Sequence, residues 1–158
     1  MGKLSAGILL YRNTKGTLEV MLVHPGGPLW KNKDLGAWSI PKGEFVPGQN
    51  PLKTAKREFK EETGGTIKGE FKELVPVRQA GGKLVYAFAV EGDFDVAKLI
   101  SNTFPMEWPP KSGRIEKIPE VDRGEWFDLV TARTKINSAQ SAFIDQLESF
   151  FSPGGGLH

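Results

Sequence analysis

The sequence predicts an α/β (α+β) domain in which helices cover a mixed β-sheet. Strand-like apolar runs are interleaved with two helical segments, and two of these runs are joined by a turn short enough to make them antiparallel. The chain has 158 residues, which is enough for one buried core and short for two. We therefore expect a single domain over residues 1–152, followed by a flexible tail at 153–158.

The first half of the chain carries clear element boundaries. Strands are expected at Leu4–Tyr11 and Leu18–His24, because both runs are apolar and the turn-forming segment 13–16 separates them. A loop rich in Gly, Pro and Trp follows at Pro25–Leu35. The clearest helix begins at Asn50-Pro51, where a capping residue precedes proline at the first helical position, and ends at a Gly-Gly pair.

The second half is less sharply marked. A second pair of strands is expected at Phe71–Gln79 and Lys83–Glu91, joined by a glycine turn. Segment Asn102–Asp122 contains four prolines, and we expect an irregular loop with a functional role. A short strand is expected at Glu125–Leu129, and a last helix at about Ile136–Phe151, where apolar residues recur on one face.

The composition limits the partners and the chemistry. Lys plus Arg number 21 against 19 Asp plus Glu, so neither a nucleic acid nor a membrane surface is the expected partner. The absence of cysteine excludes thiol nucleophiles and sulfur-bound metals, and two histidines leave oxygen ligands for any metal. No apolar run approaches the roughly 20 residues that cross a bilayer. We expect a cytoplasmic protein, either a monomer or a homodimer.

Three glutamates on the central helix carry the strongest chemical signal. Glu58, Glu61 and Glu62 fall on one arc of the helical wheel, beside the apolar stripe. Like charges about 5 Å apart repel by roughly 3 kcal/mol at an effective dielectric constant near 20. Mg²⁺ takes oxygen ligands of this kind. A solvated acidic patch paired with Arg57 and nearby lysines is the alternative for the cluster alone.

The residues around this helix resemble the Nudix box. Its pattern is Gly, five residues, Glu, seven residues, then Arg-Glu-apolar-x-Glu-Glu-x-Gly-apolar. The positions that match are Gly43, Arg57, Glu58, Phe59, Glu61, Glu62 and Gly64. Gln49 replaces the first glutamate and Gly65 the last apolar residue, which puts one accessory carboxylate in doubt. The run Trp38–Gly43 before the box is also similar to this family.

The resemblance implies the Nudix fold, an α/β/α sandwich around a mixed sheet, and Mg²⁺- or Mn²⁺-dependent hydrolysis of a diphosphate linkage in a nucleoside diphosphate joined to a further group. The metal ligands implied are Glu58, Glu61 and Glu62, with a backbone carbonyl of Lys42 or Gly43. Arg57 and Gly64 take structural roles, Arg57 by orienting the glutamates.

The resemblance also suggests which carboxylates act in catalysis. Glu58 is the first choice of general base, and Glu61 belongs to the same catalytic group. Many members of the family add a glutamate from a loop before the last core strand. Glu120 is the candidate here, in competition with other acidic residues of that region: Glu116, Asp122 and Glu125.

Aromatic and basic residues in two loops are candidates for substrate binding. They are Trp30 and Lys33 before the box, and Trp108, Lys111 and Arg114 in the long loop. Each of them has an exposed or packing role as its alternative. Lys42, next to the expected metal, is a further candidate for a phosphate contact.

The substrate subclass is weakly marked. The Trp-Ser-Ile-Pro-Lys-Gly run resembles the dinucleoside polyphosphate hydrolases, but Gly81–Lys83 stands where many of these have Tyr, and Ala80 where ADP-ribose hydrolases have Pro. A dinucleoside polyphosphate or a (d)NTP is the expected nucleotide substrate. A catalytically silent Nudix-fold module that binds a nucleotide or sugar is the alternative. An isopentenyl diphosphate isomerase would need a cysteine.

Overall fold

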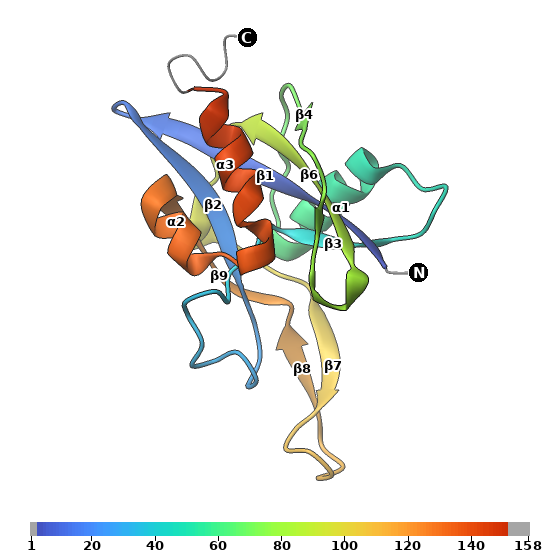
Figure 1. The fold of residues 1–158 in the computed structure, drawn as a ribbon. Coiled ribbons are helices and arrows are strands. Elements are labelled where there is room, and N and C mark those ends of the chain that lie inside the picture. The colour runs from blue at the N-terminus through green and yellow to red at the C-terminus, as the bar shows by residue number, and fades with distance from the viewer. Residues whose placement is uncertain (1–2, 152–158) are drawn as a thin grey trace.

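Residues 3–151 are described in the computed structural model, which shows a mixed sheet with helices on both faces (Figure 1). The main sheet has seven strands, five of them in the order β4-β6-β1-β2-β9. A separate two-stranded sheet, β7-β8, projects from this body. The expected tail at 153–158 lies outside the described residues.

Strand β1 (Leu4–Thr14) is the centre of the sheet. It pairs antiparallel with β2 (Thr17–Pro25), which confirms the predicted hairpin, and parallel with β6 (Leu84–Glu91). Its side chains alternate between two apolar cores, since Ile8 packs on one face and Leu9 on the other. The sheet is therefore buried on both sides, as an α/β/α sandwich requires.

Strand β3 (Lys42–Phe45) pairs with residues 4–7 of β1, whereas β2 pairs with residues 11–14 of β1. Gly7 lies at this branch, where a Cβ would come within 2.4 Å of the Pro41 carbonyl oxygen. Only glycine allows the backbones to approach so closely. An antiparallel bridge between Val23 and Ser39 joins β2 to the segment that precedes β3.

Helix α1 (Pro51–Thr63) covers one face of the sheet and has the predicted limits. The Asn50 side chain accepts a hydrogen bond from the Lys53 amide, and Gly64 ends the helix with a positive φ of 82°. These are the usual N-cap and C-terminal glycine arrangements. Helices α2 (Leu129–Lys135) and α3 (Ser141–Ser149) cover the opposite face (Figure 1).

The single C-terminal helix expected at 136–151 is wrong. The chain forms α2 earlier than expected, then a short 3₁₀ turn, η3 (Ser138–Gln140), and only then α3. Asn137 causes the break, because its side-chain oxygen accepts a hydrogen bond from the Ala139 amide and so caps η3.

The strand expected at Phe71–Gln79 is interrupted. Only β4 (Lys72–Glu73) and β5 (Val77–Arg78) pair with β6. Between them, the Val75 amide donates to the side-chain oxygen of Gln146 on α3, and the Gln146 amide donates to the Val75 carbonyl. The backbone of Val75 is thus satisfied by a helix side chain in place of a strand neighbour. The glycine turn before β6 contains a 3₁₀ turn, η1 (Ala80–Gly82).

The irregular loop expected at 102–122 is also wrong. After the 3₁₀ turn η2 (Val96–Lys98), this segment forms an antiparallel hairpin of β7 (Thr103–Glu107) and β8 (Ile115–Pro119). Proline is tolerated on edge strands, and both strands of a two-stranded sheet are edges. The last strand, β9 (Val121–Asp128), begins four residues before its expected start at 125.

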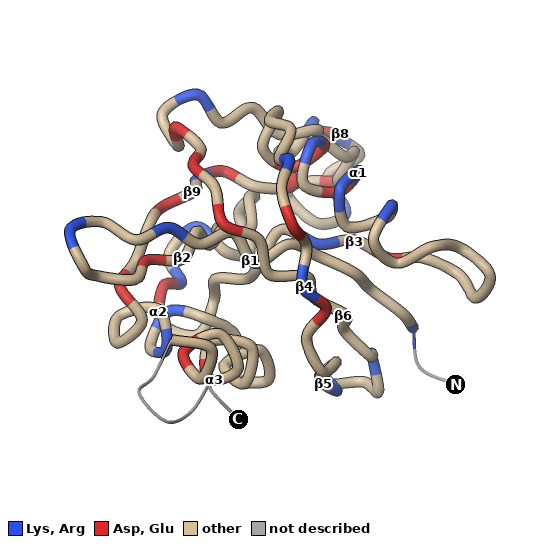
Figure 2. The backbone as a smooth tube through the Cα atoms, turned by 90° about the horizontal axis from the view of Figure 1, so that it is seen from above, with Lys and Arg blue, Asp and Glu red and all other residues tan. Residues whose placement is uncertain are grey.

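Lys and Arg residues are spread over the chain and do not gather on one face (Figure 2). Within residues 3–151, no helix combines the length and the apolar character needed to cross a membrane.

Candidate active site

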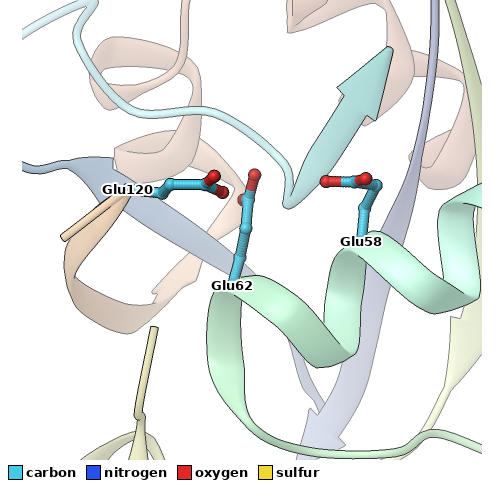
Figure 3. Close-up of side chains that lie close together, drawn as sticks. All are labelled: Glu58, Glu62 and Glu120. Carbon is cyan, nitrogen blue, oxygen red and sulfur yellow. The ribbon is translucent and has the colours of Figure 1, made fainter. Parts of the chain in front are cut away.

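Three carboxylates from two distant segments meet at one edge of α1 (Figure 3). Glu58, Glu62 and Glu120 each place one carboxylate oxygen within 4.8 Å of the others. Glu58 and Glu62 are one turn apart on α1, and Glu120 lies between β8 and β9. Glu61 is outside this group, although its charge raises the pKa of both Glu58 and Glu120.

The backbone of Glu120 is held by two neighbouring segments. Its amide donates to the Asn102 carbonyl at 2.8 Å, and its own carbonyl accepts from the Gly26 amide at 3.1 Å. Of the competing acidic residues, Asp122 hydrogen-bonds His24 instead. These contacts direct Glu120, and not its neighbour two residues on, toward α1.

Gly43 provides the space that Glu58 occupies. A Cβ at this position would lie 2.0 Å from the carboxyl carbon of Glu58, so any side chain would displace it. Arg57 contacts the same carboxylate, with 3.3 Å between Nη2 and Glu58 Oε2, and its Nε lies 3.6 Å from Glu61 Oε2. Arg57 is therefore placed to orient both glutamates.

The cluster is electrostatically unfavourable as it stands. Burial, together with the charges of Glu58 and Glu120, raises the pKa of Glu62 to about 8 against the opposing effect of Lys42. Burial also raises the pKa of Glu58 and of Glu120. The cluster has too little positive charge near it to balance the three carboxylates, and a divalent cation would supply that charge.

A pocket of about 270 Å³ opens beside the carboxylates. Lys42, Glu62 and Glu120 are among its lining residues, and we call this part, with the neighbouring Glu58, the acidic end of the pocket. The pKa of Lys42 is lowered by burial and by the nearby charge of Lys83. The floor of the pocket is apolar. It is formed by buried residues from β2, from the segment between β2 and β3, and from the start of β9: Val23, Ala37, Trp38, Ile40 and Val121.

The lining also includes uncharged polar side chains that sequence reasoning missed. We call this part the polar end of the pocket: Ser39, Gln79, Asn137 and Gln140. Gln140 is only 1% exposed, and all of its hydrogen bonds are to protein groups. These residues come from three separate segments and form no local pattern. No signal in a single sequence would have found them.

The candidate substrate residues before the box lie close to the pocket. Trp30 lines it. The ammonium nitrogen of Lys33 is 5.6 Å from the centre of the Trp30 ring, and the Lys33 carbonyl accepts a hydrogen bond of 2.7 Å from His24 Nε2. Lys33 therefore contacts Trp30 and His24, but it lines a separate hollow with His24 and Asp122 and not the pocket itself.

The candidate substrate-binding residues of segment 102–122 lie away from the pocket. Trp108, Lys111 and Arg114 lie at the tip of the β7-β8 hairpin, and the structure does not bring them to the pocket. Strands of five residues at about 3.3 Å each place the tip roughly 16 Å from the base of the hairpin.

Gln49, the residue that departs from the box pattern, has a structural contact. Its side-chain oxygen accepts a hydrogen bond of 3.0 Å from the Val46 amide, which closes the turn before α1. A carboxylate oxygen could accept the same bond, so the amide preserves this turn without the charge.

Comparison with known sequences identifies the family. A family profile described as "NUDIX domain" matches residues 1–147. The chain belongs to the Nudix family. "Nucleoside diphosphate-linked moiety X motif 6" of Mus musculus is 33% identical over 118 residues, which cover 74% of this chain but 34% of that protein. The Nudix chain thus spans about a third of that relative.

Solved Nudix structures share the fold. An Ap4A hydrolase binary complex from C. elegans has a TM-score of 0.62 at 21% identity and covers 94% of this chain and 97% of its own. The NUDIX domain of Shewanella oneidensis NrtR, complexed with ADP ribose, has a TM-score of 0.64 at 16% identity and covers 96% and 90%. Both identities are low, so these similarities establish the fold of the Nudix chain alone.

Proposed function

We propose that this chain is a Mg²⁺- or Mn²⁺-dependent pyrophosphohydrolase that cleaves a diphosphate linkage in a nucleoside diphosphate joined to a further group. The observation that carries the proposal is the meeting of Glu58, Glu62 and Glu120 beside a pocket that Glu62 and Glu120 line. Two of these residues belong to the Nudix box and the third comes from the segment before the last strand.

The residues present fit a divalent cation. The donor set is made of carboxylate oxygens, which are hard ligands of the kind that Mg²⁺ and Mn²⁺ prefer. The raised pKa values of Glu58, Glu62 and Glu120 reflect burial and mutual repulsion. Glu61, which is paired with Arg57 outside this group, would complete the set or hold water around the ion.

The protein groups divide the work of hydrolysis. Glu58 accepts a proton from the attacking water, whose oxygen bonds to phosphorus while the bridging P–O bond breaks and its electron pair leaves with the departing phosphate. Glu58, Glu62 and Glu120 would hold Mg²⁺ or Mn²⁺, which would offset phosphate charge and polarise the water. Lys42 contacts a phosphate oxygen, and Arg57 keeps Glu58 and Glu61 oriented.

The proposed substrate is a dinucleoside polyphosphate or a (d)NTP. The pocket, at about 270 Å³, is slightly smaller than the roughly 300–1,000 Å³ typical of ligand sites, and it suits one ring system. An Ap4A hydrolase and a NUDIX domain complexed with ADP ribose among the structural neighbours support a nucleotide substrate, whatever its base.

The test is product release from diadenosine polyphosphates, (d)NTPs, ADP-ribose and NADH with Mg²⁺, measured beside Glu61→Gln and Glu58→Gln. Glu73→Gln, an exposed acid on β4, is the matched control. We expect turnover that falls steeply in both site variants and is unchanged in the control. Binding of a nucleotide with no turnover of any substrate would indicate the silent binding module instead.

A further inference from the structure

The polar end of the pocket is built around a side chain with a fixed orientation. The Ile40 amide donates a hydrogen bond of 3.1 Å to the side-chain oxygen of Gln140. A backbone N–H can only donate, so the oxygen of Gln140 must face it. The NH₂ group of Gln140 is then turned toward Ser39 and Gln79.

This orientation is passed on to Gln79. The Gln140 NH₂ group donates to the Gln79 side-chain oxygen at 3.2 Å, so that oxygen is engaged inside the network. The remaining group of Gln79 is its own NH₂. Among residues 3–151 this NH₂ has no hydrogen-bond partner, and Gln79 lines the pocket.

Asn137 is oriented in the same way by a second backbone amide. The Ala139 amide donates to the Asn137 side-chain oxygen at 3.0 Å, which fixes the oxygen on the side of η3. The Asn137 NH₂ is left without a partner in the described part of the chain, and Asn137 also lines the pocket. Two backbone amides therefore determine that both free side-chain groups at this end are hydrogen-bond donors.

We propose that this end of the pocket selects a nucleobase that presents a carbonyl oxygen where an adenine or cytosine presents an amino group. The inference rests on the proposed function and names the substrate class within it: nucleotides of 6-oxopurines or 4-oxopyrimidines. The base lies on the apolar floor formed by Trp38 and Ile40, below Trp30, with its carbonyl edge toward Gln79 and Asn137.

The selectivity follows from donor and acceptor matching. A carbonyl oxygen accepts from either NH₂ group, whereas an exocyclic amino group would place donor against donor. Neither Gln79 nor Asn137 can reverse its amide to help, because each reversal would set a donor against a donor within the network. Sites that leave buried polar groups unpaired reject the wrong substrate strongly.

The test uses two substrate pairs that differ in the exchange of an oxo for an amino group: dITP against dATP, and dUTP against dCTP. We expect kcat/KM with Mg²⁺ to favour the oxo member of at least one pair by about tenfold or more. Gln79→Glu keeps the acceptor for Gln140 and replaces the free donor with an acceptor, so it should reduce that ratio at least fivefold. Gln146→Glu, which alters an amide on α3 outside the pocket, is the control.

A second readout separates this inference from the proposed function. Binding of IMP and AMP is measured by tryptophan fluorescence in EDTA, since Trp30 and Trp38 line the pocket. Tighter binding of IMP with no hydrolysis of any substrate would support the inference and overturn the proposed function. Hydrolysis with equal rates for oxo and amino members, or a ratio unchanged in Gln79→Glu, would overturn the inference alone. Asn137→Asp provides the same test if Gln79→Glu does not fold.

Discussion

The two ends of the pocket are built on opposite principles. At the acidic end, Glu58, Glu62 and Glu120 face one another, and burial raises the pKa of each of them. At the polar end, Gln140 is almost fully buried, yet its donors and acceptors are all matched by protein groups. A positively charged ligand would therefore stabilise the acidic end, while the polar end is organised without a ligand.

This difference assigns the two ends different functions. A cluster of like charges gains most from a cation, because the ligand removes repulsion as well as adding bonds. A satisfied amide network gains little from a ligand but holds its free donors in fixed positions. The acidic end is thus suited to chemistry and the polar end to selection.

The largest expected effect is at Glu58. Removal of a general base costs roughly 10²–10⁴-fold, so Glu58→Gln should lower kcat by that factor with Mg²⁺ present. Its amide keeps the shape of the carboxylate, and Tm should not fall. A variant that retains more than a tenth of the activity would assign the base to another residue.

Gly43→Ala tests whether the acidic end depends on close packing. The added methyl group would overlap the Glu58 carboxylate, whose carbon is 2.0 Å from the Cβ position. We expect kcat/KM to fall about 10–100-fold, since a small misplacement of a catalytic group has such a cost. The control is Ala97→Gly, which changes one methyl group at an exposed site. An active Gly43→Ala enzyme would show that Glu58 needs no support from β3.

Stability measurements against pH test the instability of the acidic end directly. The pKa of Glu62 is raised to about 8, above its ordinary value of 4.5, so folding favours its neutral form. The stability from this protonation is full below pH 4.5 and is lost as pH rises through about 8. One pKa unit corresponds to about 1.4 kcal/mol, so a shift from 4.5 to about 8 sets an upper limit of roughly 5 kcal/mol. Since the parent protein relaxes around the charged group, we expect Glu62→Gln to stabilise the metal-free protein by about 2 kcal/mol or more at pH 8.5.

Unfolding by denaturant in EDTA, at pH 5 and at pH 8.5, checks this expectation. The variant should gain over the parent protein at pH 8.5 and little at pH 5. Mg²⁺ should stabilise the parent protein more than the variant, because the variant has lost one carboxylate. Equal stabilities of the two proteins at both pH values would contradict the proposed repulsion.

The acidic end could be predicted largely from the sequence because its parts are local. Helix α1, its cap at Asn50 and its end at Gly64 follow from short-range rules, and the spacing of Glu58 and Glu62 places both on one edge. Glu120 was one of four candidates. The long-range contacts of its backbone, which no local pattern encodes, separate it from the others.

The polar end could not be predicted for the converse reason. Gln79 follows a strand that breaks because Val75 bonds a side chain of α3, and Asn137 interrupts what resembles one long helix. In both places a side chain satisfies the backbone in place of the regular pattern. The prolines of the β7-β8 hairpin predict a loop, yet the segment pairs as two strands because edge strands tolerate proline.

The smallest expected effect distinguishes two tryptophans that the sequence treats alike. Trp30 lines the pocket, whereas Trp108 lies at the hairpin tip. Loss of one stacking face costs about 1–3 kcal/mol at full contact, and Trp30 is 40% exposed, so Trp30→Ala should raise KM about three- to tenfold with kcat little changed. Trp108→Ala should change KM less than twofold. If Trp108→Ala has the larger effect, the hairpin closes over the substrate and contributes to substrate selection together with the polar end of the pocket.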